Sequence, residues 1–395
     1  MAKKTKPAKK IQTIPLFLPE IRGNEWKYVK DCLDTAWVSS AGAYVGRFEN
    51  TVAAWAKRKY AVACVNGTAA LHIALLVAGI KPEDEVVVPA LTFVATANSV
   101  RYTGAWPVFV DVEKNYWQID VQKMKDFLQK DCEYRHGQLV NRQTKRIVKA
   151  IMSVDLLGHP ADMGAILKLA RQFGLCVIED AAAAIGSFYK KKPAGALADI
   201  ACFSFNGNKM ITAGGGGMLL TDNPTWAKKA AYLTTQAKDD SLENIHNEIG
   251  FNYRLTNIQA ALGLAQMEQL GEFVKIKRRI TNTYDKNLNK IDGIKIPKEA
   301  PWARSNYWLY AILVSSRLGH DSRDLLRFLQ EKKIQTRPLW HPLYSLKPFK
   351  GCFASHIEVA DRLYKEALSL PCSVNLNAGD QKRVIDCIRL FSKTK

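Results

Sequence analysis

The sequence predicts an α/β protein with two parts: a large domain built on a mainly parallel β-sheet, and a smaller α+β domain after it. Two patterns predict this fold class. Between residues 60 and 222, short apolar runs alternate with amphipathic runs, which is typical of βαβ units. From Thr256 onward the pattern becomes helical. The chain has 395 residues, of which 47% are hydrophobic, so it is long enough to bury a substantial core.

The expected strands of the large domain are rich in valine, isoleucine and leucine. Continuous apolar runs of this kind are typical of parallel strands that helices cover on both faces. In chain order the expected strands are YAVACV, EVVVPAL, PVFVDV, KRIVKAIMSVDLLG, LCVIEDAA, DIACFSF and GGMLLTD. Helices are expected at GTAALHIALLVAGI, ADMGAILKLARQFG and NPTWAKKAAYLTT. Ligands of such sheets bind beyond the carboxyl ends of the strands, so functional residues are expected directly after a strand.

The second part is expected to open with one or two long amphipathic helices that leave the sheet, in IQAALGLAQMEQLGEFVKIKRRITNTYDKNLNK. After them, SNYWLYAILVS predicts a strand, and helices are expected at SRDLLRFLQEKK, VADRLYKEALSL and AGDQKRVIDCIRLF. We therefore expect a basic flexible tail over residues 1–12, a large domain over 13–262 and a small domain over 263–395.

The charge of the chain indicates an anionic partner. Lysine and arginine number 57 against 37 acidic residues, which gives a formal net charge of +20. Nucleic acid, a membrane surface and a phosphorylated small molecule are all compatible with that charge. The sequence has neither the apolar core of a secretory signal nor the roughly 18 apolar residues of a membrane span, so we expect a cytoplasmic protein that does not enter a membrane. The eight cysteines lack paired short spacings, which favours reduced thiols over disulfides or a zinc site.

Three strand ends carry residues suited to chemistry. In NGTAALH, Gly67 and Thr68 open a helix whose first N–H groups attract anions, although an ordinary helix cap is the alternative. Asp180 ends the apolar strand in VIEDAA, where a carboxylate is costly without a cationic partner; a capping role is the alternative. Lys209 in DIACFSFNGNK is a candidate for a desolvated amine that reacts with carbonyl groups, with a solvated loop lysine as the alternative.

Together these residues match the three needs of pyridoxal 5′-phosphate (PLP). Its phosphate needs N–H donors, its pyridinium nitrogen needs a carboxylate, and its aldehyde needs an amine. Ser204, on the strand before Lys209, is placed to add a hydroxyl to the phosphate site, and Phe93 in LTFVATAN is placed to stack on the ring. The combination therefore favours a PLP enzyme over any one of the three alternatives.

In these residues the chain resembles the DegT/DnrJ/StrS family of nucleotide-sugar aminotransferases, which share the aspartate-aminotransferase-like fold, known as PLP fold type I. The motifs that carry the resemblance span nearly the whole chain after the tail; they are NGTAALH, VPALTFVATAN, VIEDAA, FSFNGNK with its trailing glycines, and NYRLTNIQAALGLAQ. The resemblance implies that Lys209 binds the cofactor aldehyde and that Asp180 contacts the ring nitrogen. Phosphate contacts would come from Gly67, Thr68 and Ser204.

The resemblance also has implications for partners and substrate. Asn252 would reach the phosphate across an interface, which implies a homodimer with shared active sites. A narrower likeness to the LegC-type branch lies in GNEWKYVKDCLDTAWVSS, LTTQAKDD, IHNEIGFNYRLTN and TRPLWHPLY. That branch implies amino transfer to carbon 4 of a UDP-linked 4-keto-6-deoxy-N-acetylhexosamine, with L-glutamate as the amino-acid donor by analogy. Arg254, Arg337 and His341 are candidates for substrate contacts, with ordinary surface salt bridges as the alternative.

Two positions depart from the family pattern. Ala183 stands where the family usually has Glu or Gln after Asp-Ala-Ala, which removes a hydrogen bond near the ring worth about 0.5–1.5 kcal/mol. Asp155 stands where many relatives have His. We expect cofactor binding to survive these changes, whereas reaction rate or substrate choice can change.

Three other functions are alternatives to the aminotransferase. A sugar dehydratase of the same fold resembles this family but has His in place of the reactive lysine, so Lys209 disfavours it. A non-catalytic regulator that keeps the fold is left open by Ala183. A specific nucleic-acid binder is suggested by the pI of about 9.5, but the chain has no aromatic and basic reading surface and no known binding module.

Overall fold

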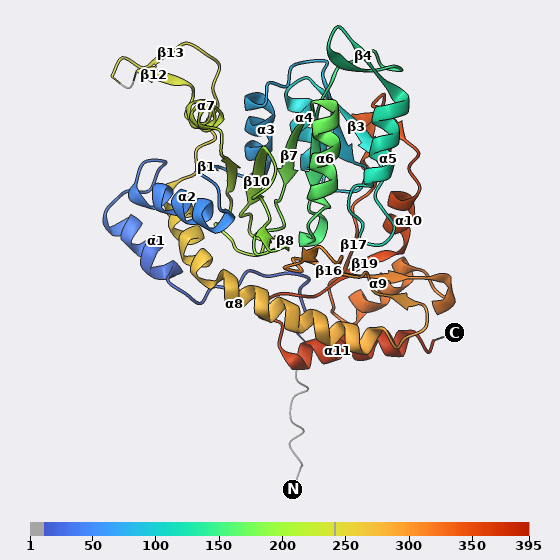
Figure 1. Ribbon diagram of the computed structural model, residues 1–395. Coiled ribbons are helices and arrows are strands. Elements are labelled where there is room, and N and C mark those ends of the chain that lie inside the picture. Colours follow the sequence, from blue (N-terminus) through green and yellow to red (C-terminus); the bar gives the residue numbers. More distant parts are fainter. Residues whose placement is uncertain (1–11, 241, 395) are drawn as a thin grey trace.

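The computed structural model describes residues 12–240 and 242–394 (Figure 1). Its largest sheet has eight strands in the order β1-β11-β10-β7-β6-β2-β3-β18. Their bounds are β1 Tyr60–Cys64, β2 Glu85–Pro89, β3 Trp106–Val110, β6 Val148–Val154, β7 Cys176–Asp180, β10 Ile200–Ser204, β11 Gly217–Thr221 and β18 Ala354–Ser355. All neighbouring pairs are parallel except those of β11, which is antiparallel to both β1 and β10. The predicted α/β class and the mainly parallel sheet are confirmed.

Helices cover both faces of this sheet, as expected for buried strands. The helices around it are α3 Gly67–Val77, α4 Ala95–Tyr102, α5 Val121–Asp126, α6 Met163–Phe173 and α7 Pro224–Thr234. Alternate residues of β2 enter different cores: Val86 and Val88 pack with α3 and α4, whereas Val87 packs with α5 and α6. Both faces of β2 are therefore buried in apolar cores, which leaves the strand ends as the place where polar groups can meet a ligand.

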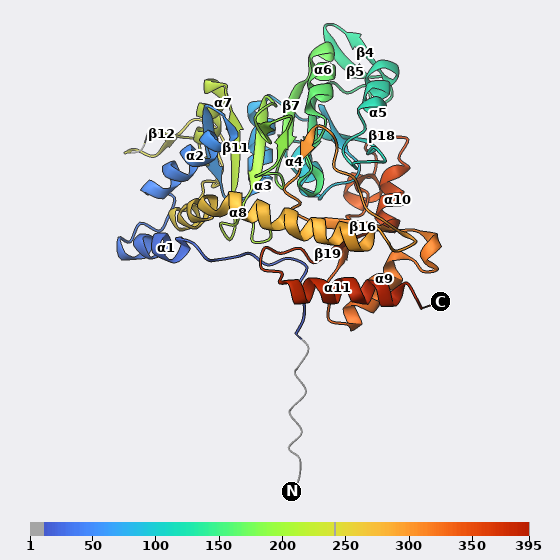
Figure 2. The same cartoon turned by 60° about the horizontal axis from the view of Figure 1, so that its bottom comes forward.

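One long helix joins the two parts of the chain. α8 (Asn257–Leu288) has 32 residues, and a capping box between Thr256 and Gln259 fixes its start. It runs across the base of the sheet beside α11 (Ala378–Phe391), and α1 (Glu25–Asp34) and α2 (Ala43–Ala56) also contact it (Figure 2). The proposed domain boundary after residue 262 falls inside this continuous helix, so the division stays a proposal.

The C-terminal part contains a second, antiparallel sheet in the order β14-β16-β19-β17. Its strands and helices are β14 Ile294–Lys295, β16 Tyr310–Val314, β17 Arg337–Pro338, β19 Ala367–Leu370, α9 Ser322–Glu331 and α10 Val359–Glu366. The expected helix over VADRLYKEALSL is wrong in its last four residues, because α10 ends at Glu366 and β19 begins. Leu368 and Leu370 are fully buried there, and pairing with β16 and β17 overrides the local helical pattern.

The remaining strands form short sheets outside these two. They are β4 Cys132–Arg135, β5 Gln138–Asn141, β8 Phe188–Tyr189, β9 Lys192–Pro193, β12 Lys238–Asp240, β13 Ile245–His246 and β15 Ala303–Arg304. The β12–β13 hairpin stands away from the body of the protein, at the upper left of Figure 1. All eight cysteines are free thiols. Within residues 12–240 and 242–394, no helix has the length and apolarity to cross a membrane. Residues 1–11 of the expected tail lie outside the described residues.

Candidate active site

A cavity of about 410 Å³ lies at the edge of the large sheet where β1, β2, β6, β7 and β10 end. Residues of the C-terminal part close its other side, among them Trp308 and Trp340. Most of the predicted site residues line this cavity, namely Gly67, Thr68, Phe93, Asp180, Ser204, Lys209 and Arg337. The fold thus brings together side chains from five separate stretches of the sequence.

Lys209 lies in the turn after β10, where its backbone N–H donates to the Asn206 carbonyl at 2.9 Å. Its side-chain nitrogen lies 4.0 Å from the centre of the Trp308 ring. Burial lowers the pKa of Lys209 to about 8, because a desolvated ammonium is costly, and the negative charge of Asp180 opposes this change. A far larger fraction of the amine is therefore uncharged near neutral pH than in an ordinary lysine, which favours its use as a nucleophile or base.

Asp180 is the last residue of β7 and is 5% exposed. Its carboxylate accepts hydrogen bonds from the Thr96 hydroxyl at 2.7 Å and from the Ala182 N–H at 3.2 Å. Burial raises the pKa of Asp180, while the Thr96 hydrogen bond and the positive charge of Lys209 oppose the rise. Both of its hydrogen-bond donors among the described residues are neutral, so a cationic ring nitrogen in the cavity would give this buried carboxylate a charged hydrogen-bond partner.

The start of α3 forms a cradle beside Ser204. Asn66 caps the helix by accepting from the Ala69 N–H at 2.8 Å, which leaves other N–H groups of the first turn outside the helix's own bonding. A Cβ atom on Gly67 would come within 2.8 Å of the Ser204 Cβ, so only glycine lets the helix start this close to Ser204. This cradle fits a phosphate group.

Three predicted residues do not line the cavity within the protomer. Asn252 is exposed, and its backbone pairs with that of Thr235 in an isolated antiparallel β-bridge. Arg254 is held by Glu49, with its two terminal nitrogens 2.5 and 3.3 Å from the carboxylate oxygens. His341 is exposed, and its ring lies 4.7 Å from that of Tyr364. The functions expected for Asn252, Arg254 and His341 stay predictions.

The two departures from the family pattern both lie at the cavity. Ala183 contributes its backbone, because its carbonyl accepts from the Asn306 side-chain amide at 2.8 Å. Asp155 is fully buried beside Glu179, and each carboxyl group has one oxygen without a donor in the described part of the chain. Burial and the nearby Glu179 carboxylate raise the pKa of Asp155 well above its ordinary value. One proton shared by this pair would satisfy both oxygens.

Sequence reasoning missed two contacts of the site. Thr96 lies within the motif VPALTFVATAN, and its hydroxyl binds the Asp180 carboxylate. Trp308 lies in SNYWLYAILVS, two residues before the start of β16, and its ring faces the Lys209 amine. The available signals are a threonine at the second residue of the helix after β2 and a tryptophan two residues before a strand, but neither indicates its partner.

The residues present fit PLP. A buried amine, a buried carboxylate with neutral donors and a glycine cradle at a helix start lie on the walls of one cavity. Lys209 would hold the aldehyde, Asp180 the ring nitrogen, and the start of α3 with Ser204 the phosphate.

Comparison with known proteins gives the same assignment. The sequence model of the DegT/DnrJ/EryC1/StrS aminotransferase family matches residues 19–389. The GDP-perosamine synthase of Escherichia coli O157:H7 is 38% identical over 97% of this chain and 99% of its own length. The UDP-4-amino-4,6-dideoxy-N-acetyl-beta-L-altrosamine transaminase of Campylobacter jejuni is 31% identical over 89% and 90%.

A solved structure agrees with these sequence matches. The DegT DnrJ EryC1 StrS aminotransferase from Brucella abortus superimposes with a TM-score of 0.84 at 28% identity, covering 94% of this chain and 96% of that one. The aspartate-aminotransferase-like fold predicted from the motifs is thereby confirmed. The protein belongs to the DegT/DnrJ/EryC1/StrS aminotransferase family, whose members use PLP to transfer amino groups to nucleotide-linked sugars.

Proposed function

We propose that the protein transfers an amino group from L-glutamate to carbon 4 of a GDP-linked keto sugar. The observation that carries the proposal is the cavity that has Lys209, Asp180 and the start of α3 on its walls. The choice of GDP is supported by the 38% identity with a protein named for a GDP-linked amino sugar. The UDP-4-keto-6-deoxy-N-acetylhexosamine implied by the LegC-type likeness is the second candidate, supported by the 31% identity with a transaminase named for a UDP-linked sugar.

Each residue of the cavity has a role in this proposal. Bound PLP supplies a ring that takes up electrons when the amino donor loses a proton. Lys209, with its pKa lowered to about 8, accepts that proton and returns it. Asp180 would keep the ring nitrogen of bound PLP protonated, and Phe93, which also lines the cavity, would stack on the ring. Arg337, which is exposed at the cavity, binds the diphosphate of the nucleotide.

We also propose a homodimer in which Asn252 of each subunit completes the phosphate site of the other. Large apolar side chains are exposed on α1, on the segment after it and on the segment that contains the β12–β13 hairpin. Among them are Trp26 at 82%, Leu242 at 90% and Ile249 at 86% exposure. Exposed apolar side chains of this size support a protein interface over this region.

The substrate proposal is tested by a direct comparison of nucleotide sugars. The purified protein, loaded with PLP, is supplied with L-glutamate and either GDP-4-keto-6-deoxymannose or UDP-4-keto-6-deoxy-N-acetylglucosamine, and the products are identified by mass spectrometry. An amine product from the GDP sugar supports the proposal, and amination of the UDP sugar alone supports the second candidate. Inactivity on both, with PLP bound, would leave the non-catalytic regulator as the better interpretation.

A further inference from the structure

Trp308 makes a cation–π contact with Lys209. The Lys209 nitrogen lies 4.0 Å from the centre of its ring, and Trp308 itself is 4% exposed. The face of an indole ring carries negative charge density and attracts a cation, more strongly where water is excluded. We propose that Trp308 is a positioning residue, whose ring face holds the Lys209 amine in the cavity and stabilises its protonated form. This inference rests on the proposed function of Lys209 in amino transfer.

The ring of Trp308 is fixed to the same turn that carries the lysine. Its indole N–H donates to the Asn208 carbonyl at 2.5 Å, and Asn208 directly precedes Lys209. The edge of the ring thus binds the backbone of the turn while its face meets the amine. This double contact leaves the indole little freedom to turn away from Lys209.

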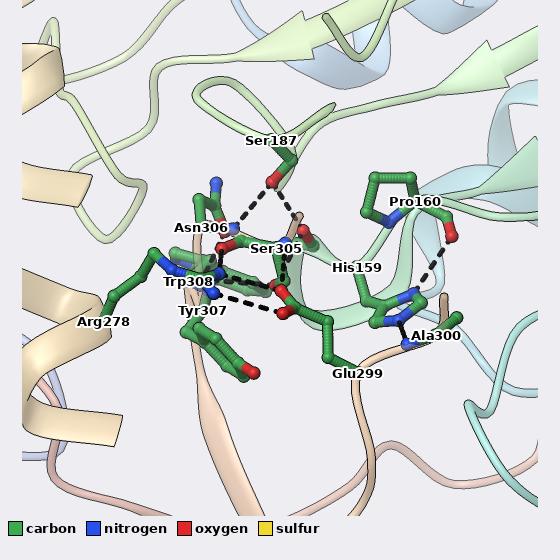
Figure 3. A network of polar contacts seen from close by, with 11 residues as sticks. His159, Pro160, Ser187, Arg278, Glu299, Ala300, Ser305, Asn306, Tyr307 and Trp308 are labelled. Carbon is green, nitrogen blue, oxygen red and sulfur yellow. Dashed lines mark hydrogen bonds and ion pairs between the residues drawn. The ribbon is translucent and has the colours of Figure 1, made fainter. Parts of the chain in front are cut away.

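The backbone of Trp308 is fixed on the opposite side by Asn306. The Trp308 N–H donates to the Asn306 side-chain oxygen at 2.8 Å. Asn306 is fully buried, and its amide nitrogen donates to the carbonyls of Ala183 and Ile185, each at 2.8 Å. Its backbone N–H donates to the Ser187 hydroxyl at 2.8 Å (Figure 3). Asn306 thus ties Trp308 to the loop that follows Asp180.

A second anchor holds the segment that leads into Trp308. The Arg278 guanidinium binds both the Glu299 carboxylate at 2.8 Å and the Ser305 carbonyl at 2.7 Å, and the Ser305 N–H donates to Glu299 at 2.6 Å (Figure 3). Tyr307, between Asn306 and Trp308, has a φ of +51°, a conformation that the surrounding hydrogen bonds maintain. The position of the indole is therefore set before any ligand enters.

Opposing effects of its surroundings set the pKa of the Lys209 amine. Burial disfavours the ammonium, whereas the indole face and Asp180 favour it. The opposing effects leave the amine able both to accept and to return a proton near neutral pH, which a base that moves a proton during amino transfer requires. Weakening the indole face alone should lower the pKa of Lys209 further.

The test replaces Trp308 alone with a series of tryptophan analogues that carry an increasing number of ring fluorines. Each added fluorine weakens the attraction of the ring for cations with little change in its shape. In the full chain freed of PLP, the rate at which acetic anhydride labels Lys209 is measured against pH by mass spectrometry. The same replacements at Trp340, which lines the cavity but whose ring makes its closest aromatic contacts with Phe93 and Trp308, serve as the matched control.

We expect the labelling midpoint of Lys209 to fall stepwise, by about 0.5 to 1 pH unit for the most fluorinated ring at position 308, and to stay constant for the Trp340 series. Thermal unfolding of all variants should remain unchanged. A midpoint that does not depend on fluorination at position 308 overturns the inference. Because the labelling needs no sugar substrate, this result is independent of whether the protein aminates a GDP or a UDP sugar.

Discussion

The inner and outer sides of the cavity differ in how completely this chain builds them. On the inner side, Asp180 and Lys209 are held by neighbours from the same chain, namely Thr96 and Trp308. On the outer side, the three residues expected to contact phosphate or substrate do not line the cavity; these are Asn252, Arg254 and His341. The carboxyl ends of parallel strands meet at one edge of a sheet, whereas the three outer residues lie outside the named helices and strands.

The largest expected effect is at the inner side. Lys209→Ala should remove the visible absorption of covalently bound PLP and reduce amino transfer by at least about 10⁴-fold, since it deletes both the covalent contact and the base. Lys192→Ala, at an exposed lysine of β9, should change neither. Visible absorption that persists in the Lys209 variant would contradict the assignment.

Asp180→Asn should reduce kcat by about 100-fold, because it makes neutral the buried carboxylate that we propose keeps the ring nitrogen protonated. The Thr96 hydroxyl can still donate to the amide oxygen, so the fold should be retained. The matched control is Asp162→Asn, at the cap of α6 outside the cavity, where asparagine caps a helix equally well. Equal activities of the two variants would contradict the proposed pairing of Asp180 with the cofactor.

Replacing the two candidate arginines, Arg337 and Arg254, should affect different quantities: KM for Arg337 and the melting temperature for Arg254. Arg337→Gln is expected to raise KM for the nucleotide sugar by about tenfold with little change in stability, because Arg337 is exposed at the cavity. Arg254→Gln is expected to lower the melting temperature, because Glu49, which is 16% exposed, loses the cation that neutralises its charge and keeps only the hydrogen bond from the Ala63 N–H. Steady-state kinetics and thermal unfolding of both variants measure this difference. The reverse pattern would place the diphosphate at Arg254, on the outer side.

A smaller effect concerns the buried pair of Asp155 and Glu179. The folded-state pKa of Asp155 is raised, so the folded protein binds a proton that the unfolded chain releases; the stability from this pair is present at low pH and is lost as pH rises. Asp155→Asn removes that dependence, because an amide can donate to Glu179 without titrating. The melting temperature of the variant should exceed that of the wild type by about 2–4 °C at mildly alkaline pH and by less at acid pH.

Asp386→Asn, at an acidic residue of α11 whose side chain is 45% exposed, controls for the loss of one negative charge. An identical pH dependence in the Asp155 variant and the wild type would show that the pair does not share a proton. Glu179→Gln should act in the same direction as Asp155→Asn.

The same contrast explains what the sequence could predict. Strands buried on both faces are continuous apolar runs, and Lys209 and Asp180 follow such runs, so both the sheet and the inner side followed from local pattern. β19 was missed because ALSL continues the helical spacing of α10, and its strand form comes from pairing with β16 and β17. The contact of Trp308 with Lys209 joins residues far apart in the chain, and no local pattern specifies it.

The smallest expected effect is at His341. Its ring packs on Tyr364 at 4.7 Å, and its Nδ1 lies 3.0 Å from the Ser345 hydroxyl, so its partners within the protomer lie on the surface. His341→Ala should therefore change kcat/KM by less than about twofold, as is usual for a surface substitution away from the reacting groups. Kinetics with the nucleotide sugar measure this. A tenfold rise in KM would show that the outer side closes over the substrate further than one protomer suggests, and would restore His341 as a substrate contact.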